Sequence, residues 1–160
     1  MTTLDDLMRL AGDQARRVMV GTKEELEPAW LLVSEGRAEV YQTPWNSDLE
    51  KRLVIETMRR IMKEERCTAY SLVTEAWMLR VDQPEAEYTG PSPSQSPDRQ
   101  ECVVVMAANG EGEHRYRTFE TVRAADGTCT ELRDLSKSED RFSGVFDNLL
   151  FGNQLKGRPH

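Results

Sequence analysis

Carboxylates near the middle of the chain are the residues best suited to chemistry. Glu75 lies inside a run of strand-forming residues, 67–81, that is mostly apolar on both faces. A carboxylate in such a strand has to be paired, hydrogen-bonded or bound to a metal, unless it lies at the edge of a face. Asp98 and Glu101 precede the next apolar run, and either could form with Glu75 a pair that holds Mg²⁺ or Mn²⁺ or transfers protons. One alternative is therefore a metal-assisted hydrolase with Glu75, Asp98 and Glu101 as its catalytic residues.

Arginines in the same region allow a second interpretation. Arg80 and Arg99 flank a Pro- and Ser-rich stretch that also contains Tyr88. These side chains, with Glu75 and Asp98, could bind a small anion or a protein. Alternatively, Arg80 or Arg99 forms an ion pair with Glu75 that anchors the stretch. We therefore predict Glu75, Arg80, Tyr88, Asp98 and Arg99 as ligand-binding residues, and this interpretation includes no metal.

Strand pairing limits how closely these groups approach one another. If the strand that contains Glu75 pairs antiparallel with the strand that begins at Glu101, the stretch between them leaves and re-enters the sheet at one end. The charged residues before the second strand then lie near Arg80. They meet Glu75 only if the stretch folds back over Trp77.

The histidines and cysteines present argue against several other chemistries. The chain has only His114 and His160, so neither a histidine-rich metal site nor a Ser-His-Asp arrangement is predicted. Cys67, Cys102 and Cys129 are odd in number and widely spaced, which indicates reduced, buried thiols rather than disulfides. Because no Cys-x-x-Cys pair occurs, a structural zinc is not expected. Apart from Mg²⁺ or Mn²⁺ in the hydrolase alternative, we expect no cofactor.

Charge and hydropathy bound the partners and the compartment. The 160 residues carry 21 Lys and Arg against 28 Asp and Glu, for a formal net charge of -7. This charge opposes binding to nucleic acid and to anionic membranes, so neither is an expected partner. The sequence has no long apolar segment and begins with acidic residues rather than a secretory signal, which predicts a cytoplasmic protein. A protein or a small anionic ligand is the expected partner, with the oligomeric state left open.

Hydrophobic periodicity predicts one α+β domain over residues 1–160. The sheet is mainly antiparallel with five or six strands, in the order hairpin, helix, three-strand meander, and the helices pack mainly on one face. The expected helices are 4–19, 48–66 and a short one near 142–150, and the expected strands are 29–34, 37–42, 67–81, 101–108, 115–123 and 129–132. A further helical turn at 22–27 is ended by Pro28. Residues 81–100 form a long loop, functional or a mobile linker, and 152–160 a frayed tail.

Aromatic residues fall into two groups. Trp30 and Trp77 lie in expected strands, where core packing accounts for them. Trp45 and Tyr88 lie in expected loops, which favours an exposed recognition role for both. The second group supports binding near the long loop.

A particular combination of segments occupies about the middle third of the chain. It consists of Glu75-Ala-Trp-Met78, the Pro/Ser-rich loop, and Pro97-Asp-Arg-Gln-Glu101 before an apolar strand. This combination resembles small uncharacterised proteins of bacteria and their phages, a resemblance that implies no activity and no functional residue. The patterns together favour a non-catalytic binding or regulatory module that engages a protein or a small anionic ligand through the long loop.

Overall fold

The first helix forms where the sequence supplies both a cap and an apolar stripe. The computed structural model describes residues 3–78, 97 and 99–135, and its α1 spans Leu4–Met19, as predicted. Thr3 and Asp6 form a capping box, in which the Thr3 hydroxyl accepts from the Asp6 N–H and the Asp6 carboxylate accepts from the Thr3 N–H. Because the buried side chains recur every three or four residues, one side of α1 lies against the sheet.

Six strands form one antiparallel sheet in the order β2-β1-β3-β4-β5-β6. The hairpin is followed by helix α2, and β4, β5 and β6 form the meander that the sequence predicts. A single α+β domain with an antiparallel sheet is therefore confirmed. The elements after α1 are β1 (Ala29–Ser34), β2 (Arg37–Gln42), α2 (Asp48–Glu64), β3 (Ala69–Met78), β4 (Gln100–Asn109), β5 (His114–Arg123) and β6 (Cys129–Asp134).

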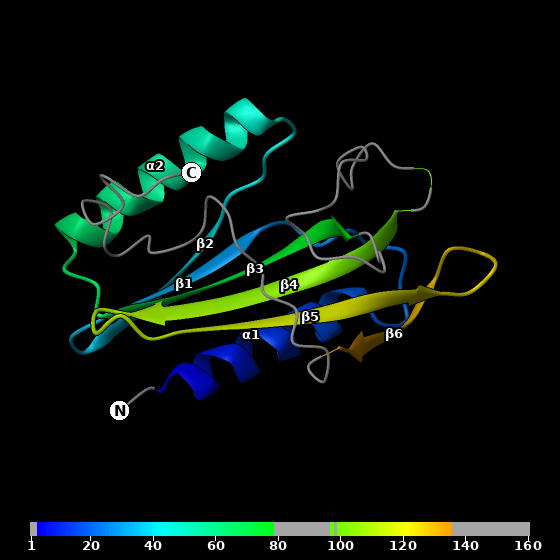
Figure 1. Cartoon of the computed structure of the whole chain (residues 1–160), viewed down its shortest axis with the longest axis horizontal. Helices are drawn as coiled ribbons and strands as arrows, with labels where there is room; N and C mark the ends of the chain where they lie inside the picture. The colour runs from blue at the N-terminus through cyan, green and yellow to red at the C-terminus, as the bar shows by residue number, and fades with distance from the viewer. Residues whose placement is uncertain (1–2, 79–96, 98, 136–160) are drawn as a thin grey trace, which may run out of the picture.

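Each face of the sheet is covered by a different helix. α1 packs on the face that carries Val73 and Phe119, whereas α2 lies over the face that carries Trp30 and Leu72. Figure 1 shows the two helices on opposite sides of the sheet. The predicted placement of the helices mainly on one face is corrected here. Successive side chains of β3 and β4 alternate between two apolar faces, and both faces have to be removed from water.

β3 occupies the interior position that the sequence predicts for the strand with Glu75. It lies between β1 and β4, and it pairs with β4 along its whole length, from Ala69 opposite Asn109 to Met78 opposite Gln100. The side chains of 69–74 are buried, whereas those that follow are partly or fully exposed. Glu75 therefore marks the boundary between the core and the surface.

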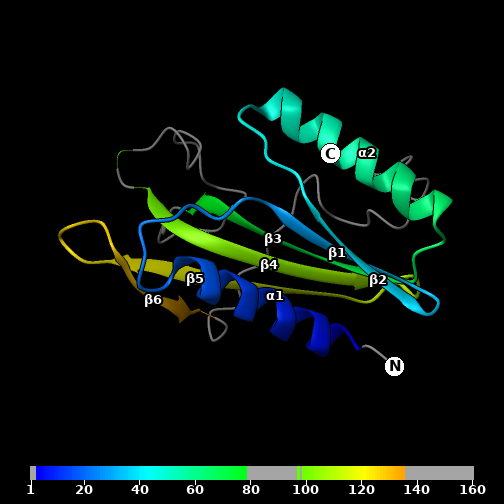
Figure 2. The same ribbon diagram turned by 180° about the vertical axis from the view of Figure 1, so that it is seen from behind.

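The segment after α1 joins the last described strand. The N–H of Gly21 donates to the Cys129 carbonyl at 2.7 Å, and the N–H of Cys129 donates to the Thr22 carbonyl at 2.9 Å. Figure 2 shows the end of α1 beside β6. The predicted helical turn at 22–27 is wrong. The Thr22 hydroxyl instead donates to carbonyls of the last turn of α1, and 23–28 form neither helix nor strand.

Some predicted elements lie outside the described residues. They are the helix near 142–150, most of the 81–100 loop, and the 152–160 tail. Within the part of the chain that is described, no helix is long and apolar enough to cross a membrane.

Candidate functional site

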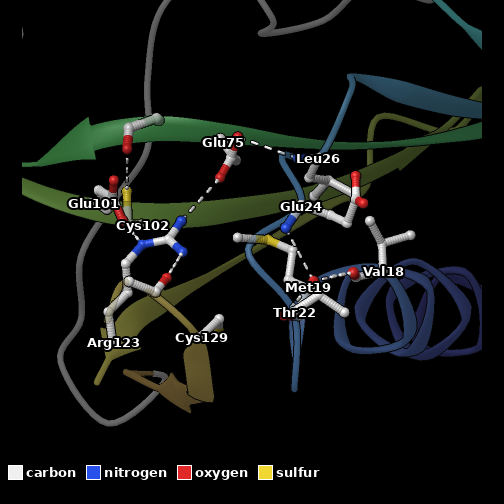
Figure 3. A network of polar contacts seen from close by, with 12 residues as sticks. Val18, Met19, Thr22, Glu24, Leu26, Glu75, Glu101, Cys102, Arg123 and Cys129 are labelled. Carbon is white, nitrogen blue, oxygen red and sulfur yellow. Dashed lines mark hydrogen bonds and ion pairs between the residues drawn. The ribbon is translucent and has the colours of Figure 1, made fainter. Parts of the chain in front are cut away.

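Arg123 lies between two carboxylates near the end of the sheet where β3 stops and β4 starts (Figure 3). Its Nε donates to Glu101 Oε2 at 2.5 Å, and its Nη2 lies 4.0 Å from Glu75 Oε1. Its Nη1 also donates to the Gly127 carbonyl at 2.8 Å. The three ionic side chains are partly buried, with exposed fractions of 25% for Arg123, 30% for Glu75 and 39% for Glu101. We call Glu75, Glu101 and Arg123 the Arg123 cluster.

Strand register brings the two carboxylates to one face. Glu75 is opposite Val103, and Trp77 is opposite Glu101. The side chains of Glu75 and Glu101 therefore project from adjacent strands on the same side, offset by two residues. Arg123 comes from the end of β5, next to an irregularity in its pairing with β6.

Glu75 has a perturbed acidity because of its position at the edge of the core. Burial is the largest influence and raises the pKa of Glu75 above its ordinary value. The Leu26 N–H, which donates to Glu75 Oε2 at 3.2 Å, and the charge of Arg123 oppose this, whereas the charges of Glu101 and Glu25 reinforce it. Glu75 thus holds the segment before β1 against the sheet and takes up a proton more readily than a free glutamate.

The nearby thiol is not suited to nucleophilic chemistry. Cys102 is 2% exposed, and its Sγ donates to the Ala76 carbonyl at 3.5 Å. Burial, with a smaller contribution from the charge of Glu75, raises the pKa of Cys102 to about 12. His114 begins β5 and stacks edge-on against Tyr116, at the opposite end of that strand from the Arg123 cluster.

Trp77 and Arg99 form an exposed stack at the same end of the sheet. The Arg99 guanidinium carbon lies 4.2 Å from the centre of the Trp77 ring, and Trp77 is 41% exposed. The predicted core position of Trp77 is therefore wrong, because the buried part of β3 ends before it. Trp30 is fully buried as predicted, and Trp45, which was expected to be exposed, is partly buried against the core under α2.

The structure brings together only some of the predicted site residues. Glu75 and Glu101 share the Arg123 cluster, and Arg99 lies over Trp77. Arg80, Tyr88 and Asp98 lie outside the described residues. The arginine that faces Glu75 is Arg123, which the sequence interpretation missed. The signal was present, because the predicted meander places 115–123 beside 101–108 and its last residue is an arginine.

Chemically, the Arg123 cluster is a network of ion pairs. A guanidinium between two carboxylates neutralises the negative charge that would attract a cation. Among 3–78, 97 and 99–135, no group of three His, Cys, Asp or Glu side chains could hold a metal ion. Two members of the proposed hydrolase site, Glu75 and Glu101, are therefore engaged with Arg123.

Comparisons with protein-family models, with curated proteins and with solved structures gave no match.

Proposed function

We propose that this chain is a non-catalytic binding or regulatory module that engages a protein at the end of the sheet where Trp77 and Arg99 stack. The exposed stack is the observation that supports the proposal most strongly. Tryptophan and arginine are enriched among the residues that contribute most to protein interfaces. The guanidinium over the ring also limits the orientations of Trp77, which lowers the entropy lost on binding.

The Arg123 cluster supports a binding role over a catalytic one. Its two carboxylates accept from, or lie close to, the same guanidinium, so both are already engaged by a group of the protein itself. The cluster also links the ends of β3, β4 and β5 next to the stack, since Trp77 lies directly opposite Glu101. A rigid base of this kind presents Trp77 in a constant position. Arg99 supplies a cation for an acidic group of the partner, and the same cation would suit a small anionic ligand.

A capture experiment tests the proposal. The wild-type protein and a Trp77→Ser/Arg99→Ser variant are cross-linked in an extract of the source organism, and the captured proteins are quantified by mass spectrometry. Leu53→Ser is the matched control, because Leu53 is 59% exposed on α2, away from the stack. We expect a partner that the wild type and the control retain and the double variant loses. Equal capture by all three proteins would contradict the proposal.

A metal-assisted hydrolase centred on Glu75, Asp98 and Glu101 is the alternative proposal. It requires a divalent ion to displace the Arg123 guanidinium from at least one carboxylate. Thermal unfolding with and without Mg²⁺ or Mn²⁺ separates the two functions, because an ion that binds only the folded state raises the unfolding midpoint. A rise that Glu75→Gln abolishes would favour the hydrolase. No response to either ion would favour the binding module.

A further inference from the structure

A hollow of about 310 Å³ lies between α1 and β5 and is lined by arginines from both elements. Arg9 and Arg16 are two helical turns apart, so they lie on the same side of α1. Arg115 and Arg117 alternate along β5, so they project from the same face of the sheet. This site is separate from the Trp77–Arg99 stack, and it involves none of the predicted site residues.

The lining of the hollow has a formal charge opposite to that of the whole chain. Its lining contains these four arginines and two aspartates, Asp5 and Asp13, which gives a formal charge of +2. The chain as a whole has a formal charge of -7. Three further carboxylates, Asp6, Glu113 and Asp134, pair with these arginines at the border of the hollow. The lining therefore suits a small anion, whereas a long polyanion is repelled by these carboxylates and by the remaining surface.

The present partners of the arginines are weakly held. Arg9 lies 3.3 Å from Asp6, and Arg16 lies 3.9 Å from Asp13. On β5, Arg115 lies 3.9 Å from Glu113 and 4.0 Å from Asp5, and Arg117 lies 3.8 Å from Asp134. All these side chains are at least 36% exposed, and exposed pairs contribute little to stability. An anion can therefore replace these carboxylates at low cost in free energy.

The interior of the hollow adds an apolar surface. Phe119 and Met8 are 2% and 7% exposed and line it with Gly12, which contributes no side chain. Arg16 lies over the Phe119 ring at 4.9 Å, which orients its guanidinium. The volume is at the lower end of that of small-molecule sites.

We propose that this hollow binds a small organic anion, whose phosphate or carboxylate oxygens contact the arginines and whose apolar part packs against Phe119 and Met8. The planar guanidinium group matches both kinds of oxygen pair.

Calorimetric titration and ¹H–¹⁵N NMR at constant ionic strength test this proposal on the full chain. The probes are phenyl phosphate and phthalate. Inorganic phosphate and benzene serve as controls for the anionic part and the apolar part of the ligand. We expect at least one organic anion to bind more tightly than inorganic phosphate and to shift the amide signals of Gly12 and Phe119. Tighter binding of phenyl phosphate indicates a phosphorylated ligand, and tighter binding of phthalate indicates a carboxylate ligand.

Substitutions show whether the arginines are responsible. Arg9→Gln/Arg117→Gln should weaken binding roughly tenfold or more. Arg37→Gln should retain it, because Arg37 is an exposed, carboxylate-paired strand arginine on the distant β2. If the double variant does not fold, the single variant Arg9→Gln replaces it in the binding measurement. Absence of binding by both organic anions, or equal weakening by Arg37→Gln, would overturn the proposal.

Discussion

Arg123 holds Glu101 more closely than Glu75, at 2.5 Å through Nε against 4.0 Å through Nη2. The closer contact is a charge-assisted hydrogen bond, whereas the other is a charge interaction without one. The two carboxylates therefore share one guanidinium unequally, and this difference can be measured.

Double-mutant cycles should give a larger coupling for Arg123 with Glu101 than for Arg123 with Glu75. The changes are Arg123→Met, Glu101→Gln and Glu75→Gln, with stability measured by urea unfolding. Because Glu101 is 39% exposed, we expect a coupling of about 0.5–1.5 kcal/mol for the first pair, and less for the second. Equal couplings would contradict the geometry.

Glu75→Gln should change how stability depends on pH. Burial raises the pKa of Glu75 in the folded state, so between the unfolded and folded pKa values the folded state binds more protons. The contribution of Glu75 to stability is therefore present below its ordinary pKa of 4.5 and is lost as the pH rises through the folded pKa. The glutamine variant should gain stability relative to the wild type across that window, as measured by urea unfolding.

Arg123→Met is a second test of the pKa of Glu75, in which the carboxylate is kept and its neighbouring charge is removed. The charge of Arg123 lowers the pKa of Glu75, so its removal should raise that pKa further and steepen the loss of stability with rising pH. A shallower profile in this variant would show that Glu75 is not the titrating group.

Thr43→Val should destabilise the fold by about 1–2 kcal/mol, because a buried donor loses its acceptor. The indole N–H of Trp30, a fully buried side chain, donates to Thr43 Oγ1 at 2.8 Å. Thr43→Ser keeps the hydroxyl and is the matched control, with a smaller expected loss. Chemical unfolding measures both, and similar losses would mean that the hydrogen bond is not the cause.

Gly12→Ala should stabilise the protein by about 0.5–1 kcal/mol, because alanine is the better helix former. A Cβ at Gly12 would lie 3.7 Å from Arg16 Nη1 and from the Phe119 ring, which is an ordinary contact distance. Gly127→Ala is the control, since Gly127 has a φ of 92° and an alanine there should destabilise. Thermal unfolding midpoints should therefore move in opposite directions.

Thiol labelling should distinguish the cysteines. Cys102 and Cys129 are buried, whereas Cys67 is half-buried. Burial raises the pKa of both Cys67 and Cys102, so labelling of the native protein at about pH 8 should be slow, with Cys67 reacting first. A Cys67→Ser variant should lose the first phase, and urea should expose the remaining thiols. Early labelling of Cys102 would contradict its burial.

Local signals explain the features that could be predicted from the sequence. α1 matches its predicted range because the Thr3 cap and the apolar stripe are contained within it. The interior position of β3 follows from apolar residues on both of its faces. Ser47 likewise caps α2 by accepting from the Glu50 N–H, and α2 starts at Asp48, the start that the sequence predicts.

Features that depend on distant segments could not be predicted in the same way. The contact of Arg123 with Glu75 requires the registers of β3, β4 and β5 together with an irregularity next to Arg123. The exposure of Trp77 depends on where the elements that pack against β3 end. In place of the helical turn predicted at 22–27, the backbone of Thr22 pairs with Cys129, more than a hundred residues along the chain.

The pairing of Thr22 with Cys129 also bears on synthesis. α1 packs on β3, β4, β5 and β6, all of which are translated after it. Its apolar side therefore lacks part of its native surface until the last of these strands has emerged. A nascent chain that stalls before Cys129 should display α1 to chaperones, and completion of β6 should release it.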